Sequence, residues 1–343
     1  MTLLLENRDL VDLMPFEDYV DAVEAGYREV GEGRAANLPR TNLWIDGHRE
    51  PGQGGGHLRA GARGSFKFKG GFVPGLGGAG IQAYTAGLPA GLQTFLFLFD
   101  TESGALDAVM EVLYYDWIKT AAVAALATKL LAPPDASRAG LFGTGRHARS
   151  QLRALVTARP IQRIDVFSRE AERRQAFCRR ATSELGIDVV PADTPEAVVE
   201  SADVITTITT SPAPVFDGRL LTRRPVHINA MGAHYPWVRE IDEHVVVRSH
   251  IILDDLAQGM QEEGEVLMPI AAGTMSPSDV AGDMAQLVAG TISGRSATTP
   301  WTLFLSGGTG IEDVSVATRL VARAREKGVG RRVDFGAAFE YRM

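Results

Sequence analysis

A short glycine-rich segment carries the strongest chemical signal in this chain. It follows an apolar run at 139–142 and precedes apolar residues at helical spacing in 149–155. In the pattern Gly-x-Gly-x-x-Ala, the first glycine allows a tight turn, the second lets the backbone approach a pyrophosphate, and the small third residue lets helix and strand pack closely. Helix N-termini also favour phosphate. We therefore predict a dinucleotide-binding turn made of Gly143, Thr144, Gly145, Arg146, His147 and Ala148.

The end of the next predicted strand, 162–168, bears on which dinucleotide is bound. Ser168 and Arg169 are suited to a 2′-phosphate, since one offers a hydroxyl and the other a permanent positive charge. Glu170 is the competing observation, because an acid in this region binds the ribose of NAD. The residues favour NADP(H) and leave NAD(H) possible. Arg169 as a solvated residue at a strand end is the ordinary alternative.

Two threonines mark a further strand end. Residues 203–209 form a β-branched run, and in a doubly wound sheet the carboxyl ends of strands line the ligand crevice. Thr207 and Thr209 are therefore candidates for contact with the cofactor. Threonine is also a good strand former, so the two interpretations are evenly balanced.

The elements that position these residues divide the chain in two. A helix at 15–34 and short strands at 40–46, 65–69, 79–84, 92–99 and 105–112 predict an antiparallel first region, with a glycine-rich loop at 52–64. After a helix at 116–131, strands alternate with helices, which predicts a parallel doubly wound sheet. These strands are expected at 139–142, 162–168, 187–190, 203–209, 226–231, 250–254 and 302–306.

Composition limits the class of protein. A formal net charge of −7 over 343 residues does not suggest a nucleic-acid-binding surface. Cys178 is the only cysteine, so neither an internal disulfide nor a cysteine-based metal site is expected, which suits a reducing cytoplasm. The N-terminus is a poor signal peptide, and the sequence contains no run of 18 apolar residues that would predict a membrane span. We expect a cytoplasmic protein with no bound metal.

The order of motifs along the chain resembles the ornithine cyclodeaminase/mu-crystallin family of NAD(P)-dependent enzymes. The resemblance covers most of the chain, and its ordered segments are far more specific than the glycine turn. The matching segments are LPR at 38–40, LFDTESG at 98–104, KTAAVAALA at 119–127, GTGRHARSQLRAL at 143–155, INAMGAH at 228–234, REID at 239–242 and TLFLSGGTGIED at 302–313.

The resemblance implies a fold and an assembly. It pairs a Rossmann dinucleotide-binding domain, residues 119–313, with an α+β substrate-binding domain built from both chain ends, residues 1–118 and 314–343. Members of the family usually dimerise through the substrate domain, so a homodimer is expected.

The resemblance also implies positions for substrate binding. A carboxylated substrate in a closed pocket needs fixed cations, and Arg40, Lys67 and Lys119 match the family's cationic positions. Arg40 as a surface residue is the alternative. Lys67 and Lys69 alternate with phenylalanines, and we expect one of the two to face solvent; the family spacing selects Lys67. The family usually has Arg where this chain has Lys119, which keeps the charge without the bidentate fork.

One position departs from the best-known members of the family. Ornithine cyclodeaminases have Asp where this chain has His234, and an imidazole exchanges protons near neutral pH but is not a permanent anion. We therefore expect Lys67 or His234 to supply the catalytic proton, and a structural role is the equally weighted alternative for His234. The resemblance places Thr120, Met231, Gly232 and Asp313 at the cofactor, with Thr120 at the end of its helix; a helix N-cap is the alternative for Asp313.

Together these residues predict an NAD(P)H-dependent reductase or dehydrogenase acting at the C–N bond of a small amino or imino acid. A ketimine-reductase-like activity is favoured, because reducing an imine needs a hydride, a proton and carboxylate binding but not the missing Asp. The alternatives are an ornithine or lysine cyclodeaminase and a crystallin-like ligand-binding protein without turnover.

Overall fold

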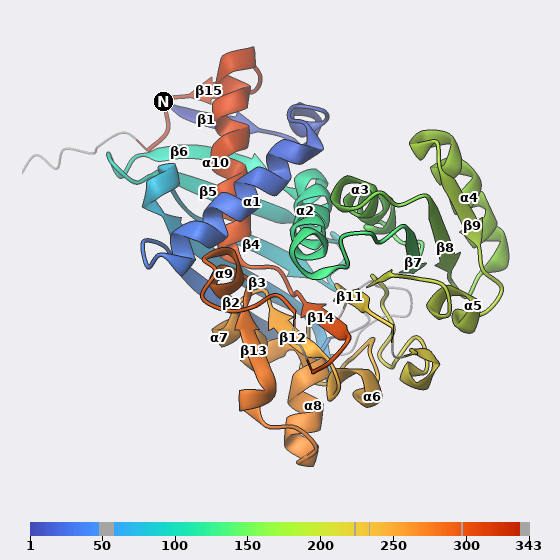
Figure 1. Ribbon diagram of the computed structural model, residues 1–343. Helices are drawn as coiled ribbons and strands as arrows, with labels where there is room; N and C mark the ends of the chain where they lie inside the picture. Colours follow the sequence, from blue (N-terminus) through green and yellow to red (C-terminus); the bar gives the residue numbers. More distant parts are fainter. Residues whose placement is uncertain (48–57, 223, 233, 296–297, 337–343) are drawn as a thin grey trace, which may run out of the picture. The chain divides into compact units, whose positions relative to one another are not determined.

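The computed structural model describes residues 1–47, 58–222, 224–232, 234–295 and 298–336 (Figure 1). Residues 52–57 of the predicted glycine-rich loop lie outside the described residues. The chain forms two compact units. The first unit comprises residues 1–119 and 309–343, and the second comprises residues 120–308. Lys119 and residues 309–313 therefore belong to the first unit, whereas the sequence assigned them to the Rossmann domain.

A seven-stranded sheet forms the centre of the first unit, in the order β15-β1-β6-β5-β4-β3-β2. Neighbouring strands are antiparallel except β1 and β6, which pair in parallel. The two strands of this sheet that the sequence did not predict, β1 and β15, come from the chain ends and complete one edge. The strands are β1 (Thr2–Leu5), β2 (Ala36–Asp46), β3 (Ala62–Val73), β4 (Gly78–Ala86), β5 (Thr94–Asp100), β6 (Leu106–Glu111) and β15 (Arg331–Val333).

Helices α1 (Phe16–Gly31) and α10 (Gly310–Lys327) pack together, and α10 crosses β3 and β4 (Figure 1). Helix α1 buries Phe16, Tyr19, Val20, Val23 and Tyr27, the three- and four-residue spacing of one helical face. Gly26 lets the two helices approach, because a β-carbon there would collide with the Ser315 side chain. Helix α2 (Leu113–Leu131) begins in the first unit and continues into the second.

The second unit is built on an eight-stranded sheet in the order β13-β12-β14-β11-β10-β7-β8-β9, and all its pairs are parallel. The chain order reverses between β7 and β10, as in a Rossmann fold, so the predicted doubly wound sheet is confirmed. The strands are β7 (Arg138–Phe142), β8 (Arg163–Phe167), β9 (Asp188–Pro191), β10 (Val204–Thr207), β11 (Val226–Ala230), β12 (His250–Leu253), β13 (Val280–Asp283) and β14 (Trp301–Leu305).

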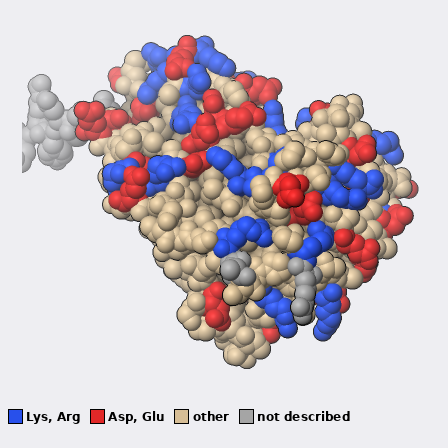
Figure 2. Space-filling view, in the orientation of Figure 1, with Lys and Arg blue, Asp and Glu red and all other residues tan. Residues whose placement is uncertain are grey.

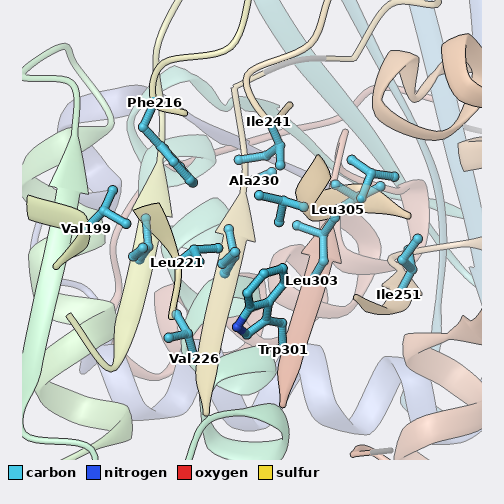
Figure 3. Packing of buried hydrophobic residues seen from close by; sticks show 14 of the residues in the cluster. Val199, Phe216, Leu221, Val226, Ala230, Ile241, Ile251, Trp301, Leu303 and Leu305 are labelled. Carbon is cyan, nitrogen blue, oxygen red and sulfur yellow. The ribbon is translucent and has the colours of Figure 1, made fainter. Parts of the chain in front are cut away.

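Helices cover both faces of this sheet, as alternate strand residues show. Leu141 packs with α3 (Ala148–Ala158) and α4 (Ala171–Leu185), while its neighbour Phe142 belongs to the opposite cluster. That second cluster contains Val199, Leu303 and Trp301 (Figure 3). The remaining helices are α5 (Pro195–Val199), α6 (Glu243–Val246), α7 (Leu256–Glu262), α8 (Gly264–Ala272) and α9 (Met284–Val288), and the 3-10 turns are η1 (Asn7–Leu10), η2 (Pro74–Leu76), η3 (Gly218–Leu220) and η4 (Pro277–Asp279).

The surface carries charges of both signs. Lys and Arg side chains are interspersed with Asp and Glu side chains on the face shown in Figure 2. Within the described residues, none of the helices combines the length and the apolar content that crossing a bilayer requires.

Candidate active site

The glycine turn lies between β7 and α3, in the strand–turn–helix context that the sequence predicted. Gly143 has φ +110°, and a β-carbon there would lie 2.6 Å from the Ile208 carbonyl oxygen. A side chain is therefore excluded by both conformation and space. At Gly145 a β-carbon would meet nothing within 4 Å, so the backbone borders open space. Ala148, fully buried, begins α3. The turn has the form that a pyrophosphate requires.

Side chains beside this turn come from the end of β8. The Thr144 hydroxyl donates to Ser168 Oγ at 3.1 Å. Arg146, Arg169 and Glu170 are exposed. Asp165, inside β8, is buried and paired with Arg163 at 2.8 Å, so it does not serve as the acid at the strand end.

The ends of β10 and β11 are joined by the buried carboxylate of Glu240, a residue that was not among the predicted site residues. Glu240 accepts from Thr207 Oγ1 at 2.9 Å, from the Thr209 amide at 2.6 Å and from the Gly232 amide at 2.8 Å. The Met231 amide donates to the Thr207 carbonyl at 2.9 Å. The hydroxyl of Thr207 is thus committed to Glu240. The only signal for Glu240 in the sequence was its place in the segment REID.

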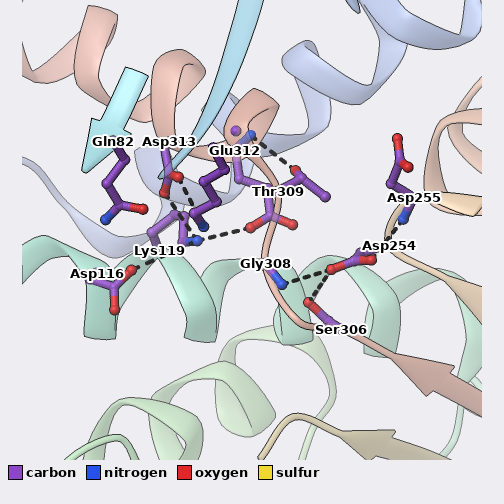
Figure 4. A network of polar contacts seen from close by, with 12 residues as sticks. Gln82, Asp116, Lys119, Asp254, Asp255, Ser306, Gly308, Thr309, Glu312 and Asp313 are labelled. Atoms are coloured by element: carbon purple, nitrogen blue, oxygen red, sulfur yellow. Dashed lines mark hydrogen bonds and ion pairs between the residues drawn. The ribbon is translucent and has the colours of Figure 1, made fainter. Parts of the chain in front are cut away.

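His234 follows β11 and is half-buried. Its ring centroid lies 4.5 Å from that of Tyr235. A β-carbon on Gly307 would lie 2.5 Å from Glu262 Oε1, 3.0 Å from Glu263 Oε1 and 3.1 Å from His234 Cβ, so glycine at this position lets His234 and two carboxylates approach the same turn. That turn is also held by Asp254, which accepts from the Ser306 hydroxyl at 2.9 Å and the Gly308 amide at 2.8 Å (Figure 4).

In the first unit, the expectation for the two lysines of β3 is wrong. Lys67 and Lys69 are two residues apart in a strand, so they project from the same face, and both are buried. Lys67 lies opposite Tyr84, with its Nζ 5.6 Å from the ring centroid. Lys69 lies opposite Gln82 and forms an ion pair with Asp313 at 2.9 Å. The two-residue spacing itself was the signal that both share one environment.

Lys119 lies at the centre of a buried ionic cluster (Figure 4). Its Nζ is 3.0 Å from Glu312 Oε2 and 3.1 Å from Asp313 Oδ1, and all three residues are about 1% exposed. Tyr27 donates its hydroxyl to Glu312 at 2.5 Å. Glu312 lies in the family segment 302–313 but was not among the predicted site residues, and it completes the cluster.

Lys69 and Lys119 both contact Asp313, but their pKa values shift in opposite directions. Burial lowers the pKa of Lys69, and the positive charges of Lys119 and Arg40 lower it further against the effect of Asp313. Burial opposes the charge of Lys119 as well, but Asp313, Glu312 and Asp116 outweigh it and raise the pKa of Lys119 well above its usual value. Lys69 is therefore the lysine that more readily releases a proton.

The structure also locates three other predicted residues. Arg40, on β2, is only 9% exposed, so the surface alternative for it is wrong. Asp313 is not the N-cap of α10, because Thr309 caps that helix and accepts from the Glu312 amide. Thr120 lies inside α2 rather than at its end, since that helix runs from Leu113 to Leu131. Within the described residues, no group of three or more His, Cys, Asp and Glu side chains is placed to hold a metal ion.

Comparison with known proteins establishes the family. The model of the ornithine cyclodeaminase/mu-crystallin family matches residues 2–328. The chain belongs to this family. The resemblance inferred from the ordered motifs is thereby confirmed.

Relatives within the ornithine cyclodeaminase/mu-crystallin family act on different amino and imino acids. A Δ1-pyrroline-2-carboxylate reductase of Bacillus cereus is 31% identical over 242 residues, which cover 70% of this chain and 74% of the relative. The iminosuccinate reductase of Paracoccus denitrificans in complex with NAD+ matches with a TM-score of 0.87 at 28% identity, over 97% of this chain and 99% of that one. A dimeric archaeal alanine dehydrogenase with bound NAD matches with a TM-score of 0.86 at 26% identity, over 97% and 99% of the two chains.

Proposed function

We propose that this chain is an NAD(P)H-dependent reductase or dehydrogenase that acts at the C–N bond of a small amino or imino acid, with imine reduction as its main reaction. The observation that carries this proposal is that the chain contains both a pyrophosphate-type glycine turn, in its second unit, and buried lysines, in its first. Reductases and dehydrogenases of imino and amino acids among its relatives support the same class of reaction.

The cofactor is a nicotinamide dinucleotide, and when bound it supplies hydride. We propose that the turn from Gly143 to Ala148 holds its pyrophosphate, with Thr120, Thr207, Thr209, Met231, Gly232 and Asp313 in its surroundings. Ser168 and Arg169 favour NADP(H), because an exposed guanidinium and a hydroxyl at the end of β8 suit a 2′-phosphate.

Cations of the first unit are proposed to bind the substrate carboxylate. Arg40, Lys67 and Lys119 are all buried, and a buried carboxylate requires such partners. Lys67 or His234 would give a proton to the nitrogen as the imine carbon is reduced. The structure adds Lys69 as a third candidate donor, because its pKa is lowered by burial.

The test is a panel of substrates assayed with NADPH and with NADH. Δ1-pyrroline-2-carboxylate, pyruvate with ammonia, and ornithine or lysine should be offered, and both cofactor oxidation and ammonia release followed. Imine-dependent oxidation of the cofactor is the expected result. Ammonia release from ornithine without net cofactor turnover would instead identify a cyclodeaminase, and binding without any turnover a crystallin-like protein.

Two sets of variants refine the assignment. Lys67→Ala should lower kcat/KM for the imine by at least 100-fold, and unchanged kcat/KM would remove Lys67 from the reaction.

Arg169→Ala should raise KM for NADPH about tenfold and leave KM for NADH unchanged. Arg173→Ala, an exposed arginine of α4, is the matched control and should alter neither constant. A preference of the wild type for NADH would contradict the role of Arg169.

We further propose a cytoplasmic homodimer formed through the first unit. Phe95, Phe97 and Phe99 of β5 project from one face of the sheet and are 38%, 37% and 38% exposed. Leu38, Leu43, Phe66 and Phe72 add further exposed apolar area on β2 and β3. A surface of this kind is typical of a protein interface, and the dimeric alanine dehydrogenase relative supports a second copy as the partner.

The cytoplasmic location is proposed from the cysteine content. The single, buried Cys178 suits a reducing compartment.

A further inference from the structure

Three hydrogen bonds, two from backbone amides and one from a side-chain hydroxyl, converge on the carboxylate of Glu240, which is completely buried. Thr207 Oγ1 and the Gly232 amide donate to one carboxylate oxygen, and the Thr209 amide donates to the other. Glu240 itself donates its backbone amide to Glu265 Oε1 at 2.9 Å. Glu265 thus holds the backbone of Glu240, while the Glu240 carboxylate binds the ends of β10 and β11.

The strands that Glu240 joins have a special place in the sheet. β10 and β11 follow β7 on the side where the chain order has reversed, and in this fold the nicotinamide half of a dinucleotide lies beyond such strand ends. The glycine turn is in direct contact with the same region. A β-carbon on Gly143 would lie 2.6 Å from the Ile208 carbonyl oxygen and 3.3 Å from Thr209 Cγ2.

A carboxylate is the group suited to these three donors. It offers only acceptors, so it satisfies two backbone amides and a hydroxyl without presenting a hydrogen of its own. An amide in its place would turn an NH2 group toward at least one donor. Gly232 completes the fit, because a β-carbon there would lie 2.6 Å from Glu240 Oε2.

We infer that Glu240 is a positioning residue for the nicotinamide half of the cofactor: its carboxylate fixes the loops after β10 and β11 in the form that receives that half. The inference rests on the proposed function for the presence of the dinucleotide. Glu240 touches neither cofactor nor substrate in this scheme and acts through Thr207, Thr209 and Gly232. Its loss is therefore expected to affect one half of the dinucleotide more than the other.

The experiment compares Glu240→Gln with the wild type in the binding of NADPH, NADH and ADP-ribose, measured by fluorescence or calorimetry. ADP-ribose lacks the nicotinamide. The variant should bind the dinucleotides about tenfold more weakly, bind ADP-ribose within twofold of the wild type, and show a lower kcat at saturating cofactor. Equal dinucleotide affinity in variant and wild type, or an equal loss for ADP-ribose, would overturn the inference.

The matched control is Asp242→Asn. Asp242 is a half-buried carboxylate two residues away that caps α6, where it accepts from the Gly218 amide at 2.6 Å and the Val245 amide at 3.0 Å. It should lower the melting temperature without changing the ratio of dinucleotide to ADP-ribose affinity. A shift of that ratio as large as the one in Glu240→Gln would contradict a specific role for Glu240.

A second pair of variants covers the case in which Glu240→Gln does not fold. Thr207→Val removes one of the three bonds to Glu240, and Thr207→Ser keeps it. The valine variant should weaken dinucleotide binding three- to fivefold with little change for ADP-ribose, while the serine variant, which keeps the hydroxyl, should weaken it clearly less. Equal affinities in both variants would overturn the inference. A wild-type protein that binds no nicotinamide dinucleotide would instead overturn the proposed function.

Discussion

Lys119 illustrates how much a single buried charge depends on its partners. Its ammonium group contacts Glu312 and Asp313, which come from a helix almost 200 residues later in the chain. Burying charges costs several kcal/mol per ion unless they are paired, and removing one partner leaves the others uncompensated. Because Lys69 of β3 also pairs with Asp313, the ionic cluster links β3 to α2 and α10.

Replacing Lys119 by Ala should destabilise the protein by about 3–5 kcal/mol, because two carboxylates lose a buried partner. Lys119→Arg keeps the charge and should retain most of the stability, in line with the arginine common in the family. Lys129→Ala, an exposed lysine of the same helix, is the control and should stay within about 0.5 kcal/mol. Urea unfolding measures all three variants. A small effect of Lys119→Ala would show that the cluster is not a structural centre.

Glu265 gives a pH-dependent prediction at the same scale. Burial raises its pKa from 4.5 to about 7. Since the folded-state pKa is above the unfolded value, the folded protein holds this proton more tightly, and stability is lost as the pH rises from about 4.5 to about 7. The penalty is complete above pH 7 and amounts to at most about 3 kcal/mol.

Glu265→Gln should therefore raise the free energy of unfolding at pH 8 by about 1–3 kcal/mol and change it little at pH 5. The glutamine keeps the oxygen that accepts from the Glu240 amide. Denaturant unfolding at both pH values tests this expectation. A stability gain of the same size at pH 5 would show that ionisation of Glu265 is not its cause.

At the scale of elements, the two glycines of the β7–α3 turn should respond differently to alanine. Gly143 has a positive φ and a carbonyl oxygen 2.6 Å from the β-carbon position, so Gly143→Ala should cost both stability and cofactor affinity. Gly145 borders open space, so Gly145→Ala should fold normally and lose cofactor affinity alone, about tenfold or more.

Melting temperatures and cofactor titrations of the two alanine variants separate these effects. Gly186→Ala provides a control for the loss of a positive-φ glycine away from the turn, since Gly186 ends α4 at φ +69° with nothing within 4 Å of its β-carbon position. It should lower stability by about 1 kcal/mol without affecting cofactor affinity. Normal cofactor binding by Gly145→Ala would place the pyrophosphate elsewhere.

At the scale of the whole molecule, the apolar outer face of the first unit's sheet should determine assembly. Its phenylalanines alternate along β5 with Leu96 and Leu98, which are buried in the core on the other side. A sheet with two apolar faces has to cover both. A charge placed among these rings is expected to prevent association without disturbing the inward face.

Phe97→Glu should convert a dimer to a monomer in light scattering coupled to gel filtration. Val11→Glu adds the same charge at a residue of this unit that is 51% exposed and lies off the sheet, and it should leave the dimer intact. A monomeric wild type, or a Phe97→Glu variant that remains dimeric, would contradict the proposed interface.

Local patterns in the sequence were sufficient to predict the parallel sheet and the glycine turn of the candidate site. Strand periodicity and glycine positions predicted the parallel sheet and the turn at Gly143, because a strand, a tight turn and a helix N-terminus are specified by neighbouring residues. The order of motifs likewise identified the family that the comparison confirmed. The short strands β1, β13 and β15 were missed, since each is stabilised by pairing with strands distant in the sequence.

The tertiary structure alone decided which polar groups share a buried environment. Both lysines of β3 lie on one face, Asp313 pairs with Lys69 and Lys119 instead of capping its helix, and Glu240 joins the ends of β10 and β11. Burial and ionic pairing depend on residues brought together from remote parts of the chain, and these contacts set which charge is fixed and which proton is released. The sequence by itself determined the glycine turn between a strand and a helix and a set of cations; the fold determined which carboxylates those cations pair with.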